Sequence, residues 1–193
     1  MSPELIDRFA EIVGPSNAVR EGRDQEPYLV EWRRLWRGTT PVVLRPGSTE
    51  EVSAILKLAH ETGTKVVPQG GNTGLVGGQI PEGDEIVVSL TRMNRIRQVD
   101  ADGNTISVDA GATLGSIREA ADDADRLFPL SLPSEGSCQI GGNLATNAGG
   151  TAVLAYGNTR DLVLGLEVVL ADGRVWNGMR KLRKDNTGYD LRH

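Results

Sequence analysis

Apolar residues near the start of the chain recur at helical spacing. They lie between Ser2-Pro3 and Gly14-Pro15. A serine followed by proline is typical of a helix start, and Gly-Pro of a helix end. The pattern therefore predicts a helix whose inward face carries Leu5, Ile6, Phe9, Ile12 and Val13.

An aromatic-rich segment follows, with Tyr28, Trp32 and Trp36. The pattern leaves the structure of this segment open, and one interpretation is a second helix that packs its rings, including the two tryptophans at i,i+4 spacing, on the domain behind it. In that interpretation these tryptophans are packing residues and not a stacking platform. Residues 1–40 as a whole are predicted to form an N-terminal helical extension.

From Pro41 onward, short apolar runs alternate with turn signals. Strands are predicted at residues 42–44, 65–67 and 85–90. Between the first two, Ser48 and Glu51 form a capping box and Gly63 provides a C-terminal signal, which predicts a helix. The first strand, this helix and the second strand form a βαβ unit, for which a right-handed crossover is expected. The residues of the helix expected to point inward are Val52, Ile55, Leu56 and Ala59.

The second half of the chain favours hairpins. Two apolar runs flank Asp102-Gly103-Asn104, and two more, at 162–170 and 174–176, flank Ala171-Asp172-Gly173. Residues 114–121 have the pattern of a helix. The expected fold class is α+β: a small βαβ subdomain beside a larger, mainly antiparallel sheet with flanking helices. This domain covers residues 41–193 and is expected to be incomplete at its C-terminus.

Composition narrows the possible functions. The chain carries a net charge of -5, so it lacks the basic surface that nucleic-acid binding requires. No apolar run reaches the roughly 20 residues that span a bilayer. The start, Met1-Ser2-Pro3-Glu4, lacks the features of a signal peptide, and the single cysteine excludes an internal disulfide. A reducing, cytoplasm-like compartment is therefore expected.

A glycine-rich loop, residues 68–78, directly follows the second predicted strand of the βαβ unit. It has the sequence Pro-Gln-Gly-Gly-Asn-Thr-Gly-Leu-Val-Gly-Gly. Without Cβ atoms, successive N–H groups can converge on a phosphate or pyrophosphate. A mobile connecting loop is an equally good interpretation of this loop alone. The fingerprints of Rossmann dinucleotide-binding proteins and of P-loop NTPases are absent from the sequence.

A second loop, residues 133–150, mixes small residues with hydroxyl and amide groups. Such a lining can lie against a flat polar ring and supply hydrogen bonds. Two loops of this kind in one domain favour a ligand site over simple turns.

These two loops, together with the segments 43–46, 164–173 and 182–191, resemble the vanillyl-alcohol-oxidase-type flavoproteins, which carry a PCMH-type FAD-binding domain. Within that group the likeness is greatest to the D-2-hydroxyglutarate dehydrogenases, D-lactate dehydrogenases and glycolate oxidase FAD subunits. The resemblance covers most of the chain from Pro41 onward.

The resemblance implies FAD as cofactor, with its pyrophosphate on the first loop and its flavin and ribityl side on the second. Some relatives attach the flavin covalently through a histidine in the first loop, and Asn72 stands in the corresponding place here. Non-covalent FAD is therefore expected. The implied cofactor-binding residues are Pro68, Gln69, Gly70, Gly71, Asn72, Thr73, Gly74, Leu75, Gly77, Gly78, Pro133, Ser134, Gly136, Ser137, Ile140, Gly141, Gly142, Asn143, Thr146, Asn147, Gly149, Tyr156 and Gly157.

Residues that could carry out the oxidation are not evident in this sequence. Oxidising a 2-hydroxy acid needs a base, usually histidine, and a cation to hold the carboxylate. His60 lies on the helix after Ser48 and His193 is the last residue, so no catalytic residue is assigned. Lys184 and Asp185 are interpreted as a solvated turn, and Cys138 as a small buried residue near the flavin and not a redox thiol. No metal site is expected.

The resemblance implies an FAD-dependent oxidoreductase for D-2-hydroxy acids, which transfers hydride from substrate C2 to flavin N5. The substrate domain is missing from this chain, so the chain alone is expected to be inactive. The electron acceptor cannot be identified, and a homodimer is possible from the sequence. Two alternatives stay open: a flavin-carrying subunit or fragment completed by another chain, and a flavin-dependent nucleotide-sugar reductase.

Overall fold

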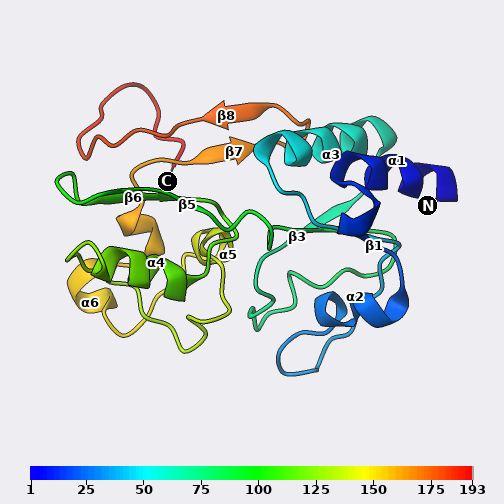
Figure 1. Cartoon of the computed structure of the whole chain (residues 1–193), viewed down its shortest axis with the longest axis horizontal. Helices are drawn as coiled ribbons and strands as arrows, with labels where there is room; N and C mark the ends of the chain where they lie inside the picture. Colours follow the sequence, from blue (N-terminus) through cyan, green and yellow to red (C-terminus); the bar gives the residue numbers. More distant parts are fainter. Residues whose placement is uncertain (193) are drawn as a thin grey trace.

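The computed structural model describes residues 1–192, and His193 lies outside them. Helices and strands are mixed along the chain, which confirms the predicted α+β class. Figure 1 shows one part with α1, α2, α3 and the strands near the N-terminus, beside a second part with the hairpins and the later helices. The elements are, in chain order, α1 (Pro3–Val13), η1 (Pro15–Asn17), β1 (Ala18–Val19), α2 (Gly22–Leu29), β2 (Val43–Leu44), α3 (Thr49–Thr62), β3 (Val66–Gln69), β4 (Ile86–Ser89), β5 (Ile96–Asp100), β6 (Thr105–Val108), α4 (Leu114–Asp122), α5 (Ile140–Ala145), α6 (Val153–Tyr156), η2 (Thr159–Leu162), β7 (Glu167–Val169) and β8 (Val175–Asn177).

The N-terminal part is built on a four-stranded sheet with the order β1-β2-β4-β3. Strands β2, β4 and β3 are parallel, as the βαβ prediction requires, but β4 lies between β2 and β3. All residues of β4 are buried, because a central strand is covered on both faces. Strand β3 lies at an edge of the sheet, where Pro68 removes no ladder hydrogen bond that the sheet needs.

Two helices cover this sheet and share its core. Ser2 accepts a hydrogen bond from the backbone N–H of Leu5 and Gly14 ends α1, as predicted. Helix α1 contacts α3, and β1 pairs with β2, so residues before position 41 contribute to the same core. The domain boundary at residue 40 stays a prediction. The core consists of Phe9, Val13, Val42, Leu44, Ile55, Leu58, Ala59, Ile86 and Val88.

Helix α3 follows its local signals closely. Ser48 Oγ accepts from the backbone N–H of Glu51 at 3.2 Å. The Glu51 carboxylate accepts instead from Gly47 N at 2.7 Å, one residue earlier than a standard capping box requires. Gly63 ends the helix in the left-handed conformation with φ 64°. Leu58 is buried although the sequence pattern did not place it on the inward face.

The C-terminal part contains two separate two-stranded antiparallel sheets, β5–β6 and β7–β8, in the described residues. Both hairpins were predicted, but they do not join into the larger antiparallel sheet expected from the sequence. Their strands share no backbone ladder, but a side-chain ion pair connects them: Arg97 Nη2 on β5 is 3.6 Å from Glu167 Oε1 on β7. Asn104 takes the left-handed conformation in the β5–β6 turn, with φ 49°.

Two segments differ from the sequence prediction. Residues 31–36 form a turn and not a helix, and Trp32 is 78% exposed. The buried carboxylate of Glu31 accepts from the backbone N–H groups of Arg33 and Leu35, which folds the chain back on itself. The second glycine-rich segment, expected as a loop, contains the short helix α5. No helix among residues 1–192 is long and apolar enough to span a bilayer.

Candidate cofactor-binding site

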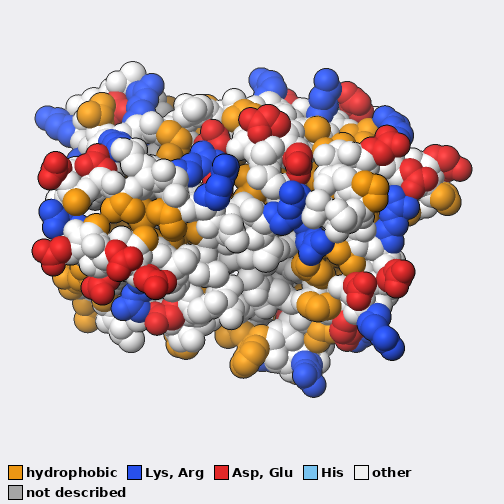
Figure 2. Space-filling model, viewed as in Figure 1, with side chains coloured by type: hydrophobic (Ala, Val, Ile, Leu, Met, Phe, Trp, Pro, Cys, Tyr) orange, Lys and Arg blue, Asp and Glu red, His pale blue; other side chains and the backbone are white. Residues whose placement is uncertain are grey.

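The fold brings the two glycine-rich loops into contact. A Cβ atom added to Gly71 would lie 1.8 Å from the carbonyl oxygen of Ser137. A Cβ atom on Gly70 would lie 3.4 Å from the Gln139 side chain. Since a Cβ at 1.8 Å is sterically impossible, glycine at position 71 is what allows the two backbones to meet. Figure 2 shows uncharged surface running between the two halves of the viewed face, over the region where these loops lie in Figure 1.

The first loop presents backbone donors that no protein group uses. In the described part of the chain, none of the N–H groups of residues 70–79 donates a hydrogen bond to another protein atom. The loop contains no acidic residue. Asn72 and Gly77 have left-handed backbones, with φ 53° and 79°, as turns that gather successive N–H groups require. The loop therefore fits a pyrophosphate, whose oxygens would accept from these donors.

Three amide side chains hold this loop in place through hydrogen bonds to backbone carbonyl groups and to one another. Gln69 Nε2 donates to the carbonyl oxygens of Tyr28 and Gln79, both at 2.9 Å. Asn72 Nδ2 donates to Pro27 O at 2.9 Å and Val30 O at 2.8 Å. Gln79 Nε2 donates to Asn72 Oδ1 at 3.1 Å and Gly74 O at 2.9 Å. Of the predicted cofactor-binding residues, Gln69 and Asn72 thus have their side-chain donors engaged within the protein.

The turn at residues 31–36 packs against the same loop. The Trp36 ring lies 3.4 Å from where a Cβ on Gly77 would be, and the Arg33 guanidinium donates to Leu75 O. Burial alone would raise the pKa of the Glu31 carboxyl, but hydrogen bonds from the backbone N–H groups of the turn lower it below its ordinary value. Glu31 is thus held as a carboxylate and keeps the turn in place beside the loop.

The second loop uses its backbone groups within the protein. Ile140 N donates to Ala112 O at 2.9 Å, and Gly141 N donates to Ala110 O at 2.8 Å. The Ile140 side chain is buried in a cluster with Ala112 and Ile117. Asn143 is buried as well, and its Nδ2 approaches Cys138 Sγ at 3.6 Å. Cys138 is 2% exposed, which agrees with its interpretation as a small packing residue.

Gln139 lies in the second loop but was not among the predicted cofactor-binding residues. It is 4% exposed, and no group among the described residues donates to its Oε1 atom. A buried acceptor without a donor is costly, and such an atom beside Gly70 suits a hydroxyl or N–H of a bound ligand. Sequence reasoning could not find Gln139, because a polar residue among small ones does not reveal where its side chain points.

Asp109 anchors the strand end that holds the second loop. Its buried carboxylate accepts from Arg95 Nε at 3.0 Å and lies 2.5 Å from Arg97 Nε. Burial would raise the pKa of Asp109, but the bonds from the two arginines lower it below the ordinary aspartate value. Asp109 immediately precedes Ala110, so this ion cluster holds in place the backbone carbonyl that accepts a hydrogen bond from Gly141 N.

The other predicted residues of the second loop lie mostly at the surface. Thr146 Oγ1 donates to Gly142 O at 2.9 Å, and Asn147 Oδ1 accepts from Arg160 N at 2.9 Å. Gly157 has φ 79° and ends α6. The exposed members of the set are Pro133, Gly136, Ser137, Gly142, Thr146, Gly149 and Tyr156, and the half-buried ones are Ser134, Gly141, Asn147 and Gly157.

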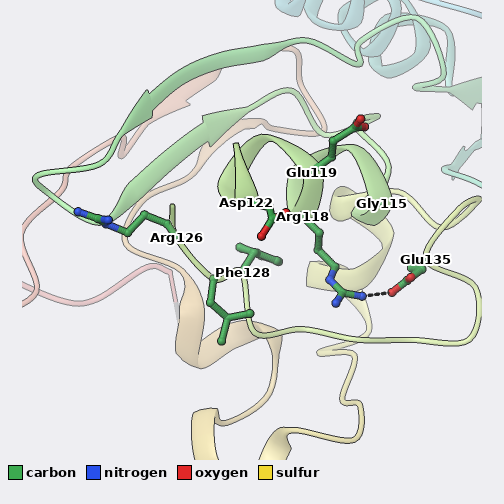
Figure 3. A pocket seen from close by; sticks show the side chains of 8 residues that line it. Gly115, Arg118, Glu119, Asp122, Arg126, Phe128 and Glu135 are labelled. Carbon is green, nitrogen blue, oxygen red and sulfur yellow. Dashed lines mark hydrogen bonds and ion pairs between the residues drawn. The ribbon is translucent and has the colours of Figure 1, made fainter. Parts of the chain in front are cut away.

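Two cavities lie elsewhere. One, of about 390 Å³, is beside α4, and Figure 3 shows the Arg118–Glu135 ion pair at its edge. The other, of about 590 Å³, is lined by residues of α3, β5 and β7, including Arg97 and Glu167. None of the predicted cofactor-binding residues lines either cavity, and both contain mixed charges. The loop pair, and not a closed pocket, is therefore the candidate site.

Catalytic side chains are not evident around the loops. His60 is exposed on α3, and Asp185 forms an ion pair with Arg180 at 3.1 Å and not with Lys184. Within residues 1–192 no group of three or more His, Cys, Asp or Glu side chains could hold a metal ion. What the site offers is a neutral backbone cradle, a contact between two small-residue loops and one buried acceptor. These features are those expected of a domain that binds a dinucleotide.

Comparison with known proteins agrees with this class. A solved structure of alkyldihydroxyacetonephosphate synthase matches with a TM-score of 0.86 and 20% identity, over 100% of this chain and 37% of that one. At this identity the similarity concerns the fold alone. The family described as FAD binding domain matches residues 40–178. The chain belongs to this family, in its PCMH-type form, and its cofactor is FAD.

Two relatives share far more sequence. D-2-hydroxyglutarate dehydrogenase, mitochondrial, from Bos taurus is 47% identical over 182 residues, 94% of this chain and 34% of the relative. The protein of the same name from Danio rerio is 49% identical over 163 residues, 84% of this chain and 31% of the relative. The chain thus spans about a third of the length of these relatives.

The names of these relatives correct one expectation. Both are called mitochondrial, so the predicted cytoplasm-like location is wrong and the comparison points to mitochondria. The prediction rested on a start without signal-peptide features and on a single cysteine. The single cysteine excludes an internal disulfide but does not separate two compartments that both keep thiols reduced.

Proposed function

We propose that this chain is the flavin-binding part of an FAD-dependent dehydrogenase of D-2-hydroxy acids, with D-2-hydroxyglutarate or D-lactate as substrate. The observation that carries the proposal is the run of free N–H donors at residues 70–79, joined to the second loop through Gly71. The names of the most similar relatives supply the substrate class. Bound FAD would supply the hydride acceptor, flavin N5, for the hydrogen on substrate C2.

The residues of this chain hold and orient the cofactor. The first loop would bind the pyrophosphate through its oriented N–H groups. The backbone of the second loop, with Gln139 Oε1, lies beside the first loop and would bind the ribityl and flavin side. The cofactor-binding residues inferred from the sequence are proposed in these roles, with the side chains of Gln69 and Asn72 acting on the protein.

We further propose that the bond to FAD is non-covalent, since Asn72 has no nucleophilic atom and its amide is engaged with Pro27, Val30 and Gln79. A base and a carboxylate-binding cation would come from outside these residues, in the substrate domain. We infer that the chain alone does not turn over substrate. A homodimer is compatible with this arrangement.

The test is reconstitution of the purified 193-residue chain with FAD. A flavin absorbance spectrum that co-elutes with the protein, and moves to the supernatant after acid denaturation, supports the proposal. Flavin retained by the denatured protein would contradict the non-covalent bond. Failure to bind FAD at any concentration would contradict the site itself.

The substrate class needs a separate assay, with D-2-hydroxyglutarate and D-lactate as donors and a redox dye as acceptor. No dye reduction is expected from the chain alone, and reduction is expected when the substrate domain is supplied. Rapid flavin reduction by NADPH, with none by either acid, would favour a nucleotide-sugar reductase instead.

A further inference from the structure

We propose that Asn72 is a positioning residue for the FAD pyrophosphate, and that it acts through the end of α2. Its amide fastens the glycine loop to residues 27–30, which lie before the family-matched region 40–178. These upstream residues would then form the outer wall of the FAD site. The inference rests on the proposed FAD binding and adds to it a role for the N-terminal segment.

The side chain of Asn72 is fully used by this contact. Its two N–H donors reach Pro27 O at 2.9 Å and Val30 O at 2.8 Å, and its Oδ1 accepts from Gln79 Nε2 at 3.1 Å. The residue has φ 53°, a conformation that asparagine tolerates better than most residues. The amide therefore contacts protein and leaves the ligand to the backbone.

Two of the carbonyl groups that Asn72 and Gln69 reach are ones that a helix end leaves unsatisfied. Helix α2 ends at Leu29, and the last four carbonyl oxygens of a helix have no partner within it. Tyr28 O accepts from Gln69, Pro27 O from Asn72, and Leu29 O from Gly38 N at 2.8 Å. The loop thus caps the helix, and the helix end in turn holds the loop.

This mutual contact explains how a loop rich in glycine can be rigid before the ligand arrives. Glycine has the highest conformational entropy of any residue in a free chain, so an unsupported loop would lose it on binding. Three amide side chains hold the loop at both of its ends and in its middle. A preorganised loop binds more tightly because that entropy is lost during folding and not during binding.

The experiment compares two substitutions at Asn72 with the same substitutions at Asn104. Asn104 also has a left-handed backbone, φ 49°, but lies in the remote β5–β6 turn, and no side-chain hydrogen bond is formed by it among the described residues. Asn72→Gly keeps the backbone conformation and removes the amide. Asn72→Asp keeps the shape but places a carboxylate against two carbonyl oxygens.

The FAD dissociation constant is measured by flavin fluorescence quenching, with far-UV circular dichroism to confirm folding. Loss of two to three hydrogen bonds predicts FAD binding weakened roughly tenfold in Asn72→Gly, and roughly a hundredfold in Asn72→Asp, where a negative charge also lies near the phosphates. Both Asn104 variants are expected to bind within about twofold of the parent chain. An Asn72→Gly chain that melts earlier but binds FAD as tightly as the parent would overturn the inference.

A second measurement needs no cofactor. The ¹⁵N relaxation of the amides of residues 70–78 in the FAD-free chain should show increased mobility in Asn72→Gly and no change in Asn104→Gly. Unchanged loop mobility would overturn the inference even if the parent chain binds no FAD. Failure of the parent to bind FAD, with increased loop mobility in the variant, would reject the proposed function and leave the positioning contact standing.

Discussion

The two loops of the proposed FAD site contain the same kinds of small residues but use their backbone groups in opposite ways. In the first, the N–H groups of residues 70–79 are free of protein acceptors, and side chains hold the loop in place. In the second, the backbone is hydrogen-bonded to Ala110 and Ala112, and Ile140 is part of a buried cluster. The first loop is therefore suited to bind charge, and the second to provide shape and a fixed wall.

The largest effect is expected where the loops meet. Gly71→Ala places a Cβ 1.8 Å from Ser137 O, and the backbone must move. We expect the free energy of unfolding to fall by about 3 kcal/mol or more, measured by urea denaturation. Gly78→Ala in the same loop is the control, since a Cβ there meets nothing within 4 Å, and it should change stability by at most about 0.5 kcal/mol. Equal stability of both variants would show that the loops do not approach each other this closely.

The packing role of the second loop predicts the next effect. Ile140→Ala removes a buried side chain that is 7% exposed and should lower the free energy of unfolding by about 2 kcal/mol or more. Leu75→Ala, on the first loop, removes a side chain that is half exposed and should cost about 0.5 kcal/mol or less. Thermal or urea unfolding of the FAD-free chains checks both values. An equal loss in the free energy of unfolding for Leu75→Ala and Ile140→Ala would show that the two loops do not differ in packing.

A substitution at Gln139 is expected to change the stability of the chain and its FAD binding in opposite directions. Gln139→Met keeps the length of the side chain and removes the Oε1 atom that has no donor. The FAD-free chain should become more stable by about 1 kcal/mol, because a buried unsatisfied acceptor is lost. FAD binding should weaken in the same variant. A chain that loses stability would show that Oε1 is already satisfied in the folded protein.

The smallest effect concerns the turn that packs on the first loop. The pKa of Glu31 is lowered in the folded chain, so its contribution to stability is present above the ordinary carboxylate range and is lost as pH falls through the lowered pKa. The fluorescence of Trp32 and Trp36 should therefore change at a pH below that range. In Glu31→Gln this transition should be absent. A transition that persists in the variant would assign it to another carboxylate, such as Asp109.

Local features of the sequence predicted the elements well. Ser2 and Gly14 bound α1, Ser48 and Gly63 bound α3, and Asp102-Gly103-Asn104 forms the turn of the β5–β6 hairpin. The sequence left the structure of the aromatic segment open, with a helix as one interpretation. Tyr28 lies in α2, but a turn holds Trp32 and Trp36, because Glu31 is buried and organises it. Spacing cannot show that a carboxylate is buried, since burial depends on segments distant in the sequence.

Local sequence patterns were enough to predict the α+β class, most helix and strand positions and the two glycine-rich loops, since caps, turns and periodicity act over a few residues. Only the tertiary structure placed β4 between β2 and β3, brought Gly71 against Ser137 and turned Asn72 toward Pro27. The last two contacts join residues 66 and 45 positions apart, from 137−71 and 72−27. Contacts at such separations form only when the whole chain packs, so which amide holds the loop and which group faces the cofactor could not be read from local pattern.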